Sequence, residues 1–269
     1  MIDRFNFYDI YGYLIPGMLL IALIWLPHAV VAGAMPSAAV TAAVAALIAA
    51  YIAGHVLQVL ATKVIPINTG AGGRFPSDWM LDEDDSTFPS ALKKSLADAI
   101  KTRFGLDVRN HAPSRRTAFF LCRDALIAAK TTPYVEQFQG LYALMRGICA
   151  ASAIGCAYQI GWLWSPWICE ECRVPAAGFT MILLLLAVFL GMLHGDDRTA
   201  LGGLVLFLFA AAGTLTANGL ARHTGVLSAG ALSSLTVAIL TFGAYLSFAA
   251  EWVKTIYRGF VVLATSKST

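Results

Sequence analysis

Apolar blocks of about 20 residues recur along the chain, and they contain acidic or basic residues only at their edges. A helix rises about 1.5 Å per residue, so a block of this length crosses the roughly 30 Å hydrocarbon core of a bilayer. Six blocks fit, over residues 11–31, 37–60, 141–164, 177–194, 201–221 and 230–250. Only 13% of the 269 residues are charged, against about 25% in a soluble domain, which argues against an ordinary globular fold.

We therefore expect an all-α polytopic membrane protein with about six transmembrane helices and a small helical cytosolic insertion. Residues 1–62 hold the first two transmembrane helices in this scheme, and residues 63–140 form a cytosolic helical module. Residues 141–269 supply four more transmembrane helices and a cytosolic C-terminal tail. The first span is followed by an A-x-A-like site at residues 32–34, but a basic n-region is lacking before it, so we expect this span to be retained.

The basic residues predict the orientation of the chain. Twelve of the 19 Lys and Arg residues, from Lys63 to Arg146, lie in the long loop or at its edge with the third span. Five more lie at the N-terminus, after the fourth span and in the C-terminal tail, whereas Arg173 and Arg222 lie on the other side. Because Lys and Arg concentrate in cytoplasmic loops, we expect the long loop and both termini to be cytosolic.

Three amphipathic helices are predicted within the long loop between the second and third spans, and the last of them continues into the third span. The first begins near Thr87 and ends at Gly105, and four apolar residues recur on one face: Phe88, Leu92, Leu96 and Ile100. The second covers residues 114–130, and the third begins at Pro133 and runs directly into the third span. Because about 80 residues make a small core, we expect the module to pack on the membrane, on another copy or on a partner protein.

A polar face is predicted on the second span, where Tyr51, His55 and Gln58 are spaced i, i+4 and i+7. Polar groups in hydrocarbon need partners, so this face should point into the helix bundle or into a water-filled path. The residues could line a pore or gate, or they could form a hydrogen bond between helices. Similarly, Pro16 near the start of the first span frees a backbone carbonyl that could bind an ion or a neighbouring helix.

Basic side chains recur every seven residues at Arg116, Arg123 and Lys130, which places them along one stripe of the second module helix. Such a stripe can bind anionic lipid headgroups or a nucleotide-like anionic ligand, and it can also be a plain solvated face. Cys169 and Cys172, in the predicted outer loop, are candidates for a disulfide or for free thiols.

We expect neither enzymatic activity nor a cofactor or metal. Metalloprotease and hydrolase motifs such as H-E-x-x-H and G-x-S-x-G do not occur in the sequence. The mid-span regions contain no carboxylate, which disfavours a transporter coupled to protons or sodium. Direct DNA binding is not expected either, because the net charge is only +3.

Short motifs carry a resemblance to known proteins. They read F-Y-D-x-x-G-Y-L-x-P-G over residues 7–17, G-H-x-x-Q-x-L over residues 54–60 and V-x-x-x-Y-R-x-F over residues 253–260. In these motifs the chain resembles a set of uncharacterised bacterial multi-pass membrane proteins, some of them similar to membrane components of anti-phage defence systems. The resemblance implies a bacterial inner (plasma) membrane location and an effector or partner within it, but no catalytic residue.

Together these observations predict an oligomeric channel-like or membrane-perturbing effector controlled through its cytosolic module. A membrane anchor that recruits a soluble cytosolic partner protein is the alternative, and a transporter is a third.

Overall fold

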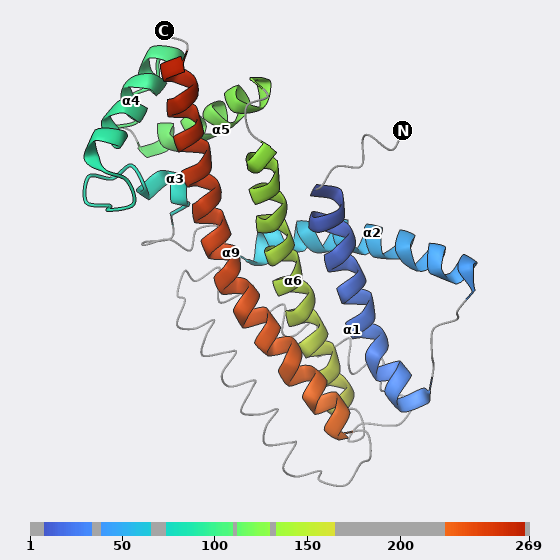
Figure 1. Cartoon of the computed structure of the whole chain (residues 1–269). Helices are drawn as coiled ribbons and strands as arrows, with labels where there is room; N and C mark the ends of the chain where they lie inside the picture. Colours follow the sequence, from blue (N-terminus) through green and yellow to red (C-terminus); the bar gives the residue numbers. More distant parts are fainter. Residues whose placement is uncertain are drawn as a thin grey trace. The chain divides into compact units, whose positions relative to one another are not determined.

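The computed structural model of the chain describes residues 8–33, 39–65, 74–109, 112–129, 133–164 and 224–266 (Figure 1). Within these ranges every regular element is helical and no strand occurs. Four helices are long and apolar enough to cross a membrane, over Asp9–Val30, Val40–Lys63, Val135–Leu163 and Val226–Ser266. They correspond to the first, second, third and sixth predicted spans. The all-helical, membrane-compatible fold is confirmed, whereas the predicted spans over 177–194 and 201–221 lie outside the described residues.

The chain divides into two compact units. Among the described residues, the span unit contains 9–65, 144–164 and 224–242, and the module unit contains 74–143 and 243–266. Two helices, α6 (Pro133–Trp164) and α9 (Thr224–Ser266), have residues in both units and are unbroken over their whole length. The units are therefore joined by continuous helices as well as by loops.

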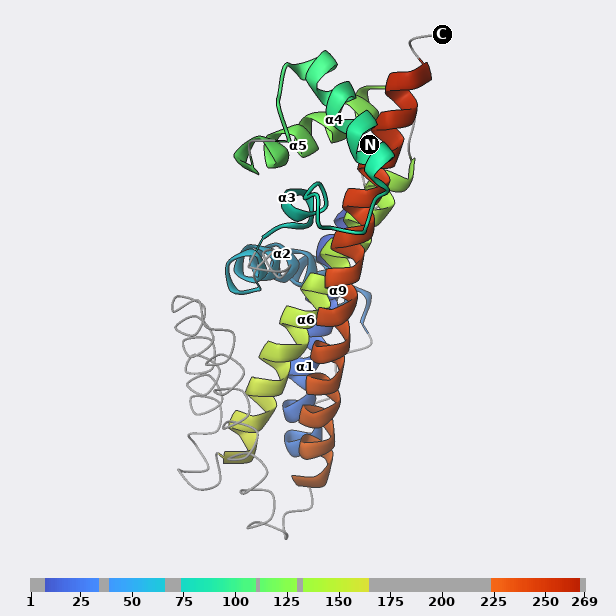
Figure 2. The ribbon, with the colours of Figure 1, turned by 90° about the vertical axis from the view of Figure 1, so that its left-hand side faces the viewer.

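The span unit begins with a π-helical turn, η2 (Asp9–Leu14), that leads into α1 (Ile15–Ala32). The next helix, α2 (Val40–Val64), crosses α1 steeply, as Figure 1 shows, and Figure 2 views α2 nearly end-on. Glycine allows this crossing, because an ideal Cβ on Gly54 would lie 2.0 Å from the Tyr13 carbonyl oxygen and one on Gly17 would lie 1.8 Å from that of Ala50. At these positions two backbones touch, so even a methyl group does not fit.

The module unit contains the three predicted helices together with a short turn of helix, α3 (Pro76–Trp79). The first predicted helix is α4 (Ser90–Phe104), which ends at Gly105 in a left-handed conformation with φ of 70°. The second is α5 (Ala112–Ala128), and the third is the start of α6. The predicted apolar faces are confirmed, since Phe88, Leu96 and Ile100 on one side of the core meet buried residues of α5 on the other.

The end of α9 completes the core of the module unit, although the sequence predicted a cytosolic tail there. This helix has 43 residues, about 64 Å, which is roughly twice the thickness of the hydrocarbon core. Its last turns bury six side chains in the same cluster as α4 and α5: Trp252, Val253, Ile256, Tyr257, Phe260 and Leu263. Phe119 of α5 packs edge-on against both Trp252 and Tyr257, with ring centroids 5.1 and 5.9 Å apart. The module therefore uses the chain's own C-terminal helix to enlarge a core that was expected to be small.

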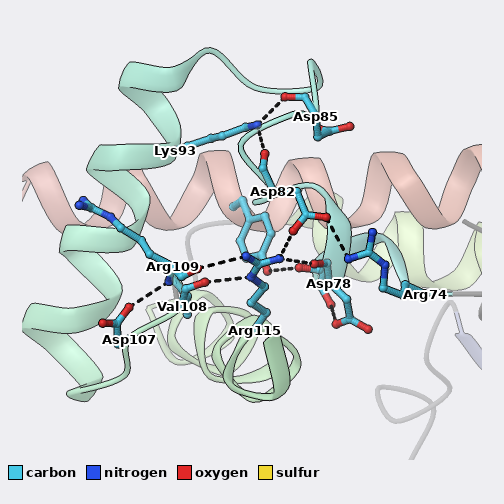
Figure 3. Close-up of polar contacts among 11 residues, drawn as sticks. Arg74, Asp78, Asp82, Asp85, Lys93, Asp107, Val108, Arg109 and Arg115 are labelled. Carbon is cyan, nitrogen blue, oxygen red and sulfur yellow. Dashed lines mark hydrogen bonds and ion pairs between the residues drawn. The ribbon is translucent and has the colours of Figure 1, made fainter. Parts of the chain in front are cut away.

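A buried guanidinium, that of Arg115, connects the loops of the module unit (Figure 3). It donates to the backbone carbonyl oxygens of Val108 at 2.9 Å, Asp78 at 2.6 Å and Arg109 at 3.3 Å. It also pairs with the carboxylate of Asp82. A buried charge is stable only when its donors are satisfied, and here one side chain fastens two stretches of chain, residues 78–82 and 108–109, to α5.

Asp82 opens the acidic run 82–85, which supports this same network. Partial burial by itself would raise the pKa of the Asp82 carboxyl, but the guanidiniums of Arg115 and Arg74 outweigh it and hold that pKa below its usual value. The ammonium of Lys93 donates to the backbone carbonyl oxygens of Asp82 and Asp85. The acidic loop is thus fixed at both ends by basic side chains (Figure 3).

Candidate functional site

A polar junction in the span unit starts from the covalent chemistry of Pro16. Proline has no N–H, so it cannot donate to the backbone carbonyl four residues earlier, that of Gly12. Gln58 on α2 takes this place, because its Nε2 donates to the Gly12 carbonyl oxygen at 2.7 Å. The Gly12 carbonyl oxygen, to which Pro16 cannot donate, therefore accepts a hydrogen bond from a neighbouring helix.

The second half of the junction is Arg146 on α6. Its Nε and Nη2 donate to Oε1 of Gln58 at 3.1 and 2.8 Å, and the Arg146 residue is only 5% exposed. Gln58, itself 4% exposed, thus accepts from α6 with its oxygen and donates to η2 with its nitrogen. Sequence reasoning counted Arg146 only among the loop charges. The signal available was a permanent cation within an otherwise apolar helix, a position that needs an internal partner.

The other two residues of the predicted polar face pack against the same segment. The ring of His55 stacks on Tyr13, with centroids 3.7 Å apart and planes 20° apart. The ring of Tyr51 makes T-shaped contacts with both rings, with centroid distances of 4.6 Å to His55 and 6.2 Å to Tyr13. The structure therefore brings the three predicted residues together at the contact of α2 with η2 and α1.

This junction joins three helices through one buried amide. The guanidinium of Arg146, the amide of Gln58 and the carbonyl of Gly12 act there as a helix clamp. Three or more metal-binding side chains do not cluster anywhere in the part of the chain that the structure describes.

Comparisons with known protein families, with characterised proteins and with solved structures gave no match. The function must therefore be argued from this chain's own residues. The resemblance of its short motifs to membrane components of anti-phage defence systems stays a hypothesis.

The predicted basic stripe lies on α5, where two of its members are described. Arg116 is exposed, and its guanidinium lies 5.0 Å from the centroid of the Phe75 ring. Arg123 is half-buried, and its Nη2 donates to Oε1 of Gln139 at 3.3 Å. Lys130 lies outside the described residues, as do Cys169 and Cys172. Behind the stripe, burial raises the pKa of the Cys122 thiol to about 12, so this cysteine stays protonated and unreactive.

One buried side chain of the span unit has unsatisfied polar atoms. Gln159 on α6 is fully buried, and neither its Nε2 nor its Oε1 makes a hydrogen bond among the described residues. Its amide lies against α9 where Gly230 leaves room, since a Cβ on Gly230 would lie 2.6 Å from Oε1. Sequence analysis did not single out this residue.

Replacing either of the two buried glutamines, Gln58 or Gln159, by leucine is expected to change stability in opposite directions. Gln159→Leu should stabilise the protein by about 1 kcal/mol, because it removes an unsatisfied buried amide. Gln58→Leu should destabilise it, because it leaves Arg146 and the Gly12 carbonyl without this partner. Thermal unfolding of the full-length protein in detergent measures both changes. A lower melting temperature for Gln159→Leu would show that the amide has a partner in solution.

Proposed function

We propose that the protein is an integral inner-membrane effector whose apolar helices form an oligomeric, channel-like or membrane-perturbing assembly under the control of its cytosolic module. One observation supports this function above the others, namely that α6 and α9 pass unbroken from the module unit into the span unit. A continuous helix transmits displacement and rotation, whereas a flexible linker does not.

The packing of these helices within each unit supports the same mechanism. In the module unit Tyr142 of α6 stacks on Tyr245 of α9, with centroids 4.8 Å apart, and their hydroxyls lie 3.2 Å apart. In the span unit α6 carries Arg146, whose side chain grips α2 through Gln58. Because Arg146 lies only four residues after Tyr142, about one helical turn, a partner or ligand that rearranges the module would act almost directly on this clamp.

The experiment changes Gly243, the first residue of α9 that belongs to the module unit. Gly243 faces open space, with no atom within 4 Å of an ideal Cβ, so Gly243→Ala should keep the helix and the activity. Gly243→Pro should break the helix, because proline removes a backbone hydrogen bond and clashes with the preceding turn. Purified protein is first sized by light scattering and then recorded in planar bilayers. We expect a homo-oligomer with discrete currents, unchanged in Gly243→Ala and at least fivefold lower in Gly243→Pro at the same oligomeric mass.

A membrane anchor that recruits a soluble cytosolic protein is the second candidate. It is favoured by the polar face of α2, because Gln58 there is used for helix packing and not for lining an open path. An electrically silent oligomer or monomer would reject the channel-like effector, and a stoichiometric soluble protein that purifies with it would support the anchor. The resemblance suggests phage challenge of expressing cells as the setting for either test.

A further inference from the structure

The outer side of α5 has a composition that the packing of the module does not explain. Arg116, Phe120, Arg123 and Ile127 fall within about 60° of one another around the helix axis, and we call these four residues the α5 outer face. Phe120 is 43% exposed and Ile127 is 41% exposed. The helix is held to the module by another side, through residues such as Phe119 and Cys122 that are fully buried. The outer face is therefore available to a partner.

The two arginines of this face are only partly neutralised within the module, since Arg123 pairs with the Asp124 carboxylate and donates to Gln139. Arg116 makes no hydrogen bond or ion pair to any described residue, and its guanidinium only overlies the Phe75 ring. Arg123 lies 3.8 Å from the carboxylate of Asp124, which is two-thirds exposed, and its Nε has no partner in the described part of the chain. A guanidinium offers five N–H donors in a fork that matches phosphate oxygens.

The chain itself restricts where α5 can lie. Its last residue, Ala128, lies five positions before Pro133, where α6 begins. Five residues of fully extended chain span at most about 18 Å. The apolar, membrane-compatible stretch of α6 starts at Val135. Val135 is itself buried in the module core, so the C-terminal end of α5 is tethered to the start of a helix whose later residues are apolar and membrane-compatible.

We propose that the α5 outer face docks on the anionic headgroups of the membrane that holds the protein. Arg116 and Arg123 would bind lipid phosphates, and Phe120 and Ile127 would enter the boundary between headgroups and acyl chains, as in interfacial amphipathic helices. A second copy of the chain fits less well, because a two-fold contact would bring four arginines into one interface while none of the four residues of the face is acidic. Two exposed apolar side chains are also too few for a stable protein interface, which buries about 800 Å² on each partner.

The test uses full-length protein whose native cysteines are replaced and whose melting temperature is unchanged. Phe120→Cys and Ile127→Cys carry a nitroxide label, and Thr117→Cys, an exposed site about 100° from Arg116, is the matched control. Each is reconstituted in nanodiscs of phosphatidylcholine alone or with about a third phosphatidylglycerol. Paramagnetic resonance measures collisions of the label with a water-soluble nickel complex and with oxygen, which concentrates in lipid.

With phosphatidylglycerol we expect nickel collisions to fall at least fivefold and oxygen collisions to rise at positions 120 and 127, with no change at 117. The double variant Arg116→Gln, Arg123→Gln should restore nickel access at 120 while the melting temperature stays within a few degrees. Nickel collision rates at 120 and 127 that do not depend on lipid composition would overturn the proposal. An equal fall of the nickel collision rate at 117 would also overturn it. Spin–spin broadening at 120 would also overturn it, because it would assign the face to a second copy.

Discussion

Arg115→Ala is expected to destabilise the module unit by about 3 kcal/mol, because it removes a buried charge from a satisfied network. The substitution leaves the carbonyl oxygens of Asp78, Val108 and Arg109 without their donor. It also leaves Asp82 with Arg74 as its remaining arginine partner, at 2.9 Å. Both effects act on the loops before α4 and α5, so unfolding should begin there. Hydrogen exchange of the full-length protein, followed by mass spectrometry, locates the loss of protection.

The neighbouring residue provides the matched control. Arg116 has the same side chain on the same helix but is exposed, and its described contact is with the Phe75 ring. An exposed cation–π contact contributes about 0.5–1 kcal/mol, so Arg116→Ala should change stability far less. Equal melting temperatures for the two variants would contradict the view that Arg115 holds the loops together.

Adding one methyl group to a helical glycine should have opposite effects at two positions of the chain. Alanine is a better helix former than glycine by about 1 kcal/mol, so Gly243→Ala should be neutral or stabilising where no atom lies nearby. At Gly54 the same methyl group would lie 2.0 Å from the Tyr13 carbonyl oxygen and 2.6 Å from its carbonyl carbon. Because both are backbone atoms, no side chain can move away, and η2 and α2 must separate.

We expect Gly54→Ala to destabilise the span unit by about 2 kcal/mol net, within the range of overpacked cores. Separation of the helices would also lengthen the bond between Gln58 and the Gly12 carbonyl. Thermal unfolding in detergent measures the loss, and protease sensitivity of α2 reports the separation. If Gly54→Ala is as stable as Gly243→Ala, the two backbones are not in contact in the membrane protein.

Local patterns predicted much of this architecture. Apolar length identified four membrane-compatible helices, and the four-residue repeat from Phe88 to Ile100 identified the buried face of α4. Pro133 and the stripe after it placed the start of α6 correctly. These features depend on neighbours in sequence, which a single chain displays directly. The polar face of α2 was found in the same way, although its spacing could not distinguish a pore from a clamp.

Contacts between distant residues were not predictable in this way. Lys254 and Arg258 were counted as basic residues of a cytosolic tail, yet Trp252, Ile256 and Phe260 recur every four residues there and form a buried face. Arg146 and Arg115 looked like ordinary loop charges, because burial of a cation depends on carbonyls and amides supplied by other segments. The partner of Arg146, Gln58, lies 88 residues earlier in the chain.

The divided core of the module unit has a consequence for the order in which the protein is made. Its first set of core residues ends at Val135 and the second begins at Trp252, so 117 positions of translation separate them. At about 5–20 residues per second the ribosome needs on the order of ten seconds to cover that stretch. During this interval α4 and α5 have been synthesised without the helix that covers their apolar faces. The module unit can therefore complete its core only after the residues between 135 and 252 have been translated, which ties its folding to the synthesis of α9.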